Sequence, residues 1–260
     1  GAQDKEIGMT ASNGNGAPAE FITVDAGGDA RKIAMAFQPA AAGNDLAHII
    51  WLGGYRSDMT GTKAVELAGL AARLGTGCVR FDYSGHGASG GAFVDGTISR
   101  WLEETLAVID HAAKTLGTRR AVLVGSSMGG WIALRAVAEL AGRGGIDVAG
   151  LVLIAPAPDF TSDLIEPNLT EAERTALAER GQLEEPTPYG PDPNIYTRKL
   201  IEDGRDNRVL TGAIETGCPV HILQGMADPD VPYGHAVRLM EHLSGDDVVL
   251  TGESRGRLRQ

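Results

Sequence analysis

The stretch LVGSSMGGW, residues 123–131, contains the pattern G-x-S-x-G and joins two kinds of sequence. The apolar run AVLVGS that leads into it is typical of a buried strand, and the run MGGWIALRAVAEL that leaves it is typical of a helix. A serine at such a sharp strand-to-helix turn presents its hydroxyl above the sheet, beside the positive end of the helix. We therefore predict that Ser127, the middle residue of the pattern, is a nucleophile and that Ser126 only flanks it. A plain Gly/Ser turn is the alternative.

Short apolar runs alternate with amphipathic ones on both sides of this stretch. The expected strands are 21–25, 32–38, 47–53, 77–83, 121–126, 150–157, 219–225 and 247–251. The main expected helices are 62–75, 97–117, 128–142 and 233–245. Most of the strand runs are continuous in Val, Ile and Leu, as in parallel strands that are covered on both faces. The pattern predicts an α/β fold with a doubly wound, mostly parallel eight-stranded sheet, whose first two strands form an antiparallel edge.

The same pattern divides the chain into segments. Residues 1–20 are expected to be a disordered leader, and residues 21–158 together with 214–251 the α/β core. Residues 159–213, rich in Pro, Glu and Asp, interrupt the pattern and are expected to form a small lid between the sixth and seventh strands. Short helical pieces are expected within it at LTEAERTALAERG and NIYTRKLIEDG. Residues 252–260 form an atypical tail. Six apolar residues of the lid either line a slot for a lipid chain or pack against one another: Phe160, Leu164, Ile165, Leu169, Leu177 and Ile195.

Composition argues against several kinds of partner. The chain has 260 residues and a formal net charge of −11, which disfavours binding to nucleic acid and to anionic membranes. No apolar run approaches the roughly 20 residues that cross a bilayer, and the N-terminal residues lack the pattern of a secretory signal. Cys78 and Cys218 lie at the edges of apolar runs and are expected to be buried thiols, without a disulfide or a metal. The expected compartment is the cytoplasm.

A serine nucleophile that attacks a carbonyl needs two hydrogen-bond donors for the oxyanion that forms. The backbone N–H of Met128, directly after Ser127, is the first expected donor. The second should come from the loop after the third strand, WLGGYRSDMTGTKA, where Gly53 and Gly54 allow the backbone to bend closely. The Tyr55 N–H is the expected donor in that loop. A glycine turn that merely leads into the next helix is the alternative.

An acid is expected at the carboxyl end of a late strand, where ligands bind in open α/β sheets. Asp228 lies just past the seventh strand in ILQGMADPDVP and is the predicted acid. Asp230 is the neighbouring alternative, and Asp159 after the sixth strand is a weaker one. The alternative is that Asp228 has only a structural role, in a turn or as a helix cap.

Four motifs together resemble a known family: WLGGYRSDMTGTKA, VRFDYSGHGASGG, LVGSSMGGW and ILQGMADPDVP. Over residues 20–251 the chain resembles the α/β-hydrolase superfamily of serine hydrolases, and most closely its palmitoyl-protein thioesterase and acyl-glucuronide esterase type and the bacterial relatives of that type. The resemblance implies hydrolysis of a small-molecule or acyl-protein ester or thioester without a metal or cofactor. It implies that Ser127 is the nucleophile and Asp228 the acid, and that the base is a histidine in a loop after the last strand.

The sequence has no histidine at the position where the resemblance implies the base. The last strand is followed by GESRGRLRQ, which contains no histidine, so we expect the reading frame to be truncated or shifted at this end, or the base to be altered. Of the six histidines, His86 lies in the loop DYSGHGASGG near the expected site and is the surrogate base to test first. Loss of a triad member leaves only about 10³–10⁴-fold catalysis over water, so slow turnover is expected.

Three other functions are compatible with parts of the sequence. Residues 85–90 read G-x-G-x-x-G, but a dinucleotide fingerprint requires a helix that begins within the motif, and GAFVDGTIS follows instead. A non-catalytic small-molecule-binding protein with a hydrolase fold is favoured by the absent histidine and disfavoured by the intact serine motif. An amidase, a peptidase or a C–C hydrolase would use the same fold and residues.

Overall fold

The computed structural model describes residues 12–13 and 17–254. Most of the expected leader 1–20, and residues 255–260 of the expected tail, therefore lie outside the described residues. The part of that tail that is described does not stand apart from the sheet, because the last strand continues through Glu253, two residues further than expected.

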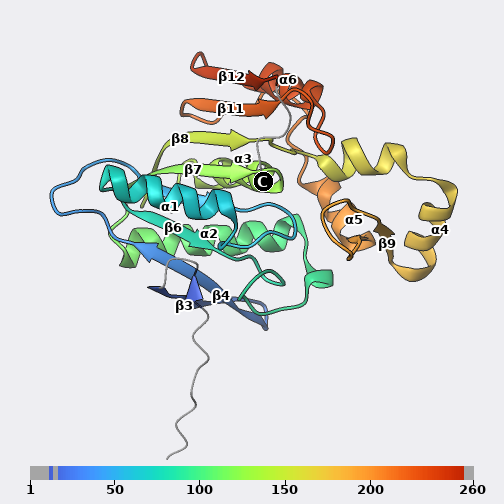
Figure 1. The fold of residues 1–260 in the computed structure, drawn as a ribbon, viewed down its shortest axis with the longest axis horizontal. Helices are drawn as coiled ribbons and strands as arrows, with labels where there is room; N and C mark the ends of the chain where they lie inside the picture. Colours follow the sequence, from blue (N-terminus) through green and yellow to red (C-terminus); the bar gives the residue numbers. More distant parts are fainter. Residues whose placement is uncertain (1–11, 14–16, 255–260) are drawn as a thin grey trace, which may run out of the picture.

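An eight-stranded sheet forms the centre of the molecule (Figure 1). Its strand order is β12-β11-β8-β7-β5-β6-β4-β3, with antiparallel pairing of β3 with β4 and of β4 with β6, and parallel pairing elsewhere. The strands are β3 (Glu20–Ala26), β4 (Asp29–Gln38), β5 (His48–Leu52), β6 (Cys78–Phe81), β7 (Arg120–Ser126), β8 (Asp147–Ile154), β11 (Val220–Gly225) and β12 (Val248–Glu253). The predicted fold class, a mostly parallel sheet with an antiparallel edge, is confirmed.

Helices cover both faces of the sheet. The main ones are α1 (Thr62–Leu74), α2 (Ile98–Thr115), α3 (Met128–Leu140) and α6 (Tyr233–His242). Successive residues of β5 face opposite sides: Ile49 and Trp51 pack with Ala64 and Ala68 of α1, whereas Ile50 packs in the larger core with α2, α3 and α6. Burial on both faces explains why the strands read as continuous apolar runs rather than as alternating ones.

The strand order places a topological switch point beside β5. After β5 the chain forms β6 on one side of it and then returns to form β7 on the other side. Crevices open where connections leave neighbouring parallel strands in opposite directions. The loops after β5 and after β7 therefore meet at the carboxyl edge of the sheet, and these loops carry the oxyanion and serine motifs expected from the sequence.

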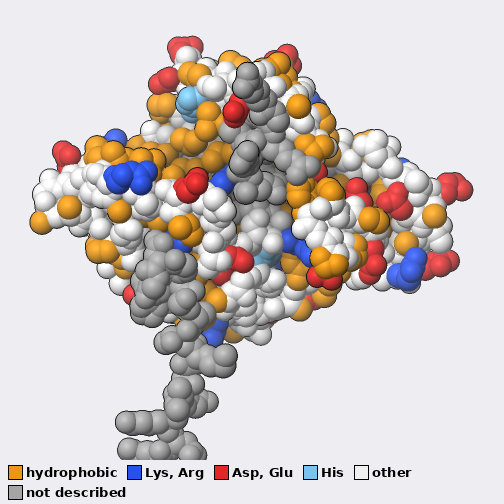
Figure 2. Space-filling view, viewed as in Figure 1, with side chains coloured by type: hydrophobic (Ala, Val, Ile, Leu, Met, Phe, Trp, Pro, Cys, Tyr) orange, Lys and Arg blue, Asp and Glu red, His pale blue; other side chains and the backbone are white. Residues whose placement is uncertain are grey.

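Residues 159–213 form a group of short elements beside that edge, to the right of the sheet in Figure 1. The elements are the π-helix η2 (Thr161–Ile165), the 3-10 helix η3 (Glu166–Asn168), α4 (Glu171–Arg180), β9 (Gln182–Glu185), β10 (Asn194–Thr197) and α5 (Arg198–Asp206). Acidic side chains are frequent on the surface of this part, which projects to the right in Figure 2. Its role as a lid stays a prediction.

One sequence expectation within this segment differs from the structure. The run NIYTRKLIEDG, expected to be helical throughout, begins as β10 and becomes helix only at Arg198. β10 pairs with β9 in an antiparallel hairpin that the sequence did not predict. The change of structure falls at Thr197, whose side-chain oxygen accepts a hydrogen bond from the Leu200 N–H at 3.1 Å and caps α5.

Candidate active site

Ser127 occupies a sharp turn between the last residue of β7 and the first residue of α3. Its backbone dihedrals are φ 54° and ψ −116°, a region that L-residues enter only when the surroundings impose it. The Ser127 N–H donates to the Ile154 carbonyl at 2.9 Å, and the Ser127 carbonyl accepts from the N–H groups of Gly130 at 2.9 Å and Ala157 at 3.0 Å. These three bonds hold the serine in its strained conformation.

The glycines of the serine motif are required by crowding. A Cβ on Gly129 would lie 2.1 Å from the Leu52 carbonyl oxygen, and one on Gly125 would lie 2.4 Å from the Gly129 carbonyl oxygen. Neither distance is compatible with a side chain of any size. The strand-to-helix turn at residues 125–129 is thus packed directly against the end of β5, as a tight elbow requires.

The loop after β5 lies directly against this turn. A Cβ on Gly54 would be 3.3 Å from the Ser126 carbonyl oxygen and 3.6 Å from the Ser127 Cβ. The Tyr55 N–H has no acceptor among the described residues, and Met128 is the first residue of α3, where N–H groups have no partner within the helix. Two backbone donors expected for the oxyanion therefore lie on the two segments that meet at Ser127.

The Tyr55 side chain fixes its own loop from the other side. Its hydroxyl donates to the Ile195 carbonyl of β10, and its ring stacks on Tyr196 with centroids 5.4 Å apart. Burial raises the pKa of the Tyr55 hydroxyl far above its ordinary value, so it stays a neutral donor. The Tyr83 hydroxyl donates to the Gly53 carbonyl at 2.9 Å and holds the start of the loop.

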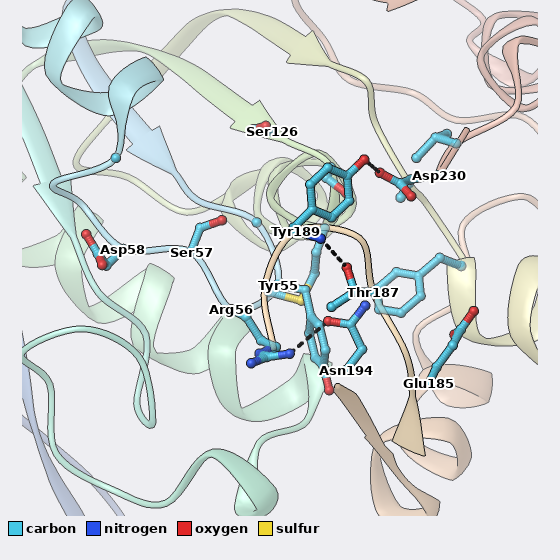
Figure 3. Close-up of a pocket in the computed structure, with 18 of the residues that line it drawn as sticks. Tyr55, Arg56, Ser57, Asp58, Ser126, Glu185, Thr187, Tyr189, Asn194 and Asp230 are labelled. Atoms are coloured by element: carbon cyan, nitrogen blue, oxygen red, sulfur yellow. Dashed lines mark hydrogen bonds between the residues drawn. The ribbon is translucent and has the colours of Figure 1, made fainter. Parts of the chain in front are cut away.

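A cavity of about 950 Å³ opens above Ser127, and Figure 3 shows residues around it. It is lined by Ser126, Ser127 and Met128 of the elbow, by the loop that follows β5, and by residues of the 157–196 segment. Three of the six apolar lid residues line it, namely Phe160, Leu164 and Ile165. Leu169 and Leu177 instead pack inside the segment with Leu183 and Ile201. Some of the six residues therefore line the cavity and others pack inside the segment, and Ile165 does both; a slot for a lipid chain stays a prediction.

The three candidate acids have different surroundings. Asp228 follows β11, and its Oδ1 accepts the N–H groups of Asp230 at 2.8 Å and Val231 at 3.0 Å, as in an aspartate turn. Asp230 lines the cavity, and its Oδ2 accepts the Tyr189 hydroxyl at 2.8 Å, the dashed line on the right of Figure 3. Asp159 is fully buried and accepts the N–H groups of Val209 and Leu210, so its carboxylate is occupied in the fold.

All six histidines lie in the described part of the chain, and none of them lines the cavity. His86 is buried beneath the loop that follows β5. Its Nδ1 lies 3.0 Å from the Ser84 carbonyl, which can only accept, so we assign the proton to Nδ1. Its Nε2 then accepts the Arg56 N–H at 3.1 Å. Both ring nitrogens are bonded to backbone groups, and burial lowers the pKa of His86, so this geometry favours a loop-holding role over that of a base.

Some cavity residues carried no signal in the sequence pattern. Lys63, in the first turn of α1, lines the cavity; burial lowers the pKa of its amine, and the Asp228 carboxylate raises that pKa in part. Arg56, with φ 62°, donates from Nη1 to the Pro193 carbonyl at 2.6 Å and to Asn194 Oδ1 at 3.0 Å. Its partners lie more than a hundred residues away in the chain, and no local pattern could have joined them.

The structure also bears on three other expectations from the sequence. Residues 85–90 form turns; after them comes the 3-10 helix η1 (Phe93–Asp95), and α2 begins only at Ile98, so the G-x-G-x-x-G motif does not open a helix. Cys78 is buried and Cys218 half-buried, and both are free thiols. Within residues 12–13 and 17–254, no helix has the length and apolar character that crossing a membrane requires.

Fold and site together define a class of protein. Residues 47–186 match the family described as "Serine aminopeptidase, S33", and the chain belongs to this α/β-hydrolase family of serine hydrolases. It is 32% identical over 216 residues to the mitochondrial palmitoyl-protein thioesterase ABHD10 of Homo sapiens, a match that covers 82% of this chain and 67% of that protein.

Solved structures show the same relationship. A putative hydrolase from Agrobacterium vitis is 64% identical with a TM-score of 0.88, and the match covers 92% of this chain and 90% of that one. The mouse α/β-hydrolase domain-containing protein 10 is 26% identical with a TM-score of 0.75, again over 92% and 90% of the two chains. The resemblance expected from the four sequence motifs is thereby confirmed, and this chain is an α/β-hydrolase enzyme.

Proposed function

We propose that this chain hydrolyses carboxylic esters or thioesters through an acyl-enzyme on Ser127. The observation that carries the proposal is the strained elbow at Ser127, which faces a cavity of about 950 Å³ and lies against the Gly53–Tyr55 loop. The name of the human relative, a palmitoyl-protein thioesterase, supports an acyl substrate. The substrate is a small-molecule ester or an acylated protein.

The proposed cycle has two halves. Ser127 attacks the acyl carbonyl while a base takes its proton, and the N–H groups of Met128 and Tyr55 hold the oxyanion. Asp228 orients the base and stabilises its cation. Water then hydrolyses the acyl-enzyme, and this chemistry requires no metal or cofactor.

The base is the unassigned part of the mechanism. No histidine of the chain lines the cavity, and the ring nitrogens of His86 are bonded to the backbone. With the oxyanion donors alone, we expect this chain to retain about 10³–10⁴-fold catalysis over water, well below a complete triad. Turnover at the rate of an intact family member would contradict this and would require a surrogate base.

Covalent labelling with a fluorophosphonate tests the nucleophile. We expect slow labelling of the wild-type chain at Ser127, no labelling of Ser127→Ala, and nearly unchanged labelling of Ser126→Ala, because only residue 127 is in the strained elbow. Mass spectrometry of the labelled peptide locates the adduct. Loss of labelling in Ser126→Ala with retention in Ser127→Ala would move the nucleophile to the neighbouring serine.

Two rival functions have specific support. A non-catalytic binding protein is favoured by the cavity without a lining histidine, and it predicts no labelling even at high probe concentration. An amidase or peptidase is favoured by the description of the matching family, a serine aminopeptidase. Turnover of an amide with the acyl group of the best ester separates that function from an esterase.

The remaining expectations concern partners and location. The net charge of −11 supports the absence of nucleic-acid partners. A cytoplasmic location stays a prediction, since the name of the human relative places that protein in mitochondria.

A further inference from the structure

The lining of the cavity above Ser127 is of two kinds. Polar and charged side chains come from the loop that follows β5, such as Arg56 and Asp58, and from the first turn of α1, which carries Lys63. Three apolar side chains come from the start of the 159–213 segment, namely Phe160, Leu164 and Ile165, which we call the apolar wall. An ester has a carbonyl with one group on each side, so a cavity lined in two unlike ways can distinguish its acyl chain from its leaving group.

The apolar wall is held firmly in place. Asp159, at φ 55°, is fully buried, and its two carboxylate oxygens accept the N–H groups of Val209 and Leu210, both at 2.8 Å. The adjacent Phe160 packs edge-on against Trp131 of α3 with ring centroids 5.5 Å apart. These contacts fix the start of the wall relative to the core.

The back of the wall is equally close-packed. A Cβ on Gly204 of α5 would lie 2.1 Å from the Thr161 Oγ1, so η2 and α5 are in direct contact. The Thr161 hydroxyl is buried and has no hydrogen-bond partner among the described residues. The wall has little freedom to move back from the cavity, because it is packed against both α3 and α5.

Ile165 lies at the boundary between the cavity and a second apolar cluster. It lines the cavity, and it also packs against the buried cluster of Leu177, Leu183 and Ile201. These three residues do not line the cavity. The side chain of Ile165 therefore separates the space above Ser127 from the interior of the 159–213 segment.

We propose that the acyl chain of the substrate lies along the apolar wall and that Ile165 sets the greatest chain length the cavity accepts. The proposal rests on the proposed function, because Ser127 is taken to hold the acyl carbonyl. Each methylene that the wall buries should raise kcat/KM about fourfold. The rise should end at the chain length whose terminal carbon reaches Ile165.

A series of straight-chain nitrophenyl esters, from butanoyl to hexadecanoyl, tests this with the full chain. For the wild type we expect kcat/KM to rise with chain length and then to stop rising at a break. Ile165→Ala should move the break to longer chains, with about a tenfold gain for the first ester beyond the wild-type break, because the removed carbons leave room for further methylenes. Leu164→Ala should lower kcat/KM for chains that reach it without moving the break.

Leu177→Ala is the matched control, since it truncates a neighbour of Ile165 that does not line the cavity. It should lower the thermal stability and leave the break unchanged. A break that stays in place in Ile165→Ala, or that moves as far in Leu177→Ala, would overturn the proposal, because loosening of the segment rather than the wall would then set the length.

A binding measurement separates this proposal from the proposed function. Dissociation constants of the corresponding fatty acids for Ser127→Ala, with and without Ile165→Ala, need no turnover. We expect these constants to show the same break in chain length, and we expect Ile165→Ala to move it. This result would support the role of the wall even if no ester were hydrolysed and the hydrolytic proposal failed. Fatty acids that bind without any dependence on chain length would refute the wall even if ester hydrolysis were normal.

Discussion

The apolar wall and the segment between β9 and β10 are held in different ways, although both border the same cavity. The wall begins at a buried aspartate with two backbone hydrogen bonds and packs against α3 and α5. Residues 186–193, which join β9 to β10 and which we call the strap, lie on the surface. The strap's fixed points are hydrogen bonds near solvent: Tyr189 to Asp230 on one side, and Arg56 to Pro193 on the other.

This difference predicts which of the two segments can open. Hydrogen bonds near solvent contribute about 0.5–1.5 kcal/mol each, whereas a buried donor left without a partner costs about 1–3 kcal/mol. Segments with few buried contacts open locally at much lower free energy than the core. We therefore expect the strap to admit the substrate and the wall to stay fixed while it does.

The largest expected effect is the loss of the buried carboxylate that anchors the wall. Asp159→Ala leaves the Val209 and Leu210 N–H groups buried without acceptors and places alanine at φ 55°, so the free energy of unfolding should fall by about 2–5 kcal/mol. Urea denaturation measures the change. Asp159→Asn is the comparison, because it tolerates this backbone conformation and keeps one of the two acceptor oxygens, while its NH2 group cannot accept the second N–H. It should therefore lose less stability than Asp159→Ala. Equal losses in both variants would contradict this, because the oxygen that asparagine keeps would then contribute nothing to the anchor.

A smaller and local effect is expected at the strap. Tyr189→Phe removes the hydroxyl that donates to Asp230 and should leave the global free energy of unfolding nearly unchanged, within about 0.5 kcal/mol. Amide hydrogen exchange of residues 186–193 should become about fivefold faster, which corresponds to about 1 kcal/mol of local stability.

Thr187→Ala serves as the comparison for that experiment. It removes only the acceptor of the longer bond from the Tyr189 N–H, at 3.3 Å, and should change the exchange rate less. Unchanged exchange in Tyr189→Phe would show that the bond to Asp230 does not hold the strap, and the contrast between strap and wall would then need another cause.

The sequence predicted the fixed parts of the site and not the strap, and the reason is physical. The elbow at Ser127 and the glycine turn after β5 are specified by residues close together in the chain, where crowding allows only glycine. The β9–β10 hairpin is specified by pairing across eight intervening residues that include several prolines, and the Tyr189–Asp230 bond spans 41 positions. Such long-range contacts leave no periodic signal.

One local sequence signal in that region does indicate the observed boundary. Thr197 followed by Arg198, Lys199 and Leu200 has the form of a helix start with a capping threonine, and its side chain does cap α5. A cap at Thr197 makes the helix begin at Arg198, so residues 194–197 can form a strand. The role of Asp228 had no comparable test in the sequence, because an aspartate turn after β11 and a catalytic acid share the same residue.

The smallest expected effect is a pH dependence that comes from His86, which is bonded to the loop that follows β5. Burial lowers the pKa of His86 below the ordinary histidine value of about 6.5. As the pH falls below that value, the unfolded chain binds a proton at His86 and the folded chain does not, so the free energy of unfolding should decrease on acidification until the folded pKa is reached. Asp82 and Asp159, whose pKa values burial raises, act in the opposite direction nearer to pH 4.

His86→Gln isolates this contribution, because glutamine keeps both a donor and an acceptor for the Ser84 carbonyl and the Arg56 N–H. The variant should be less stable than the wild type at pH 7, yet lose less stability than the wild type between about pH 6.5 and pH 5. Thermal melts across that range measure the two slopes. Parallel slopes would mean that His86 is protonated in the folded protein, which would break its bond to the Arg56 N–H and restore it as a candidate base for Ser127.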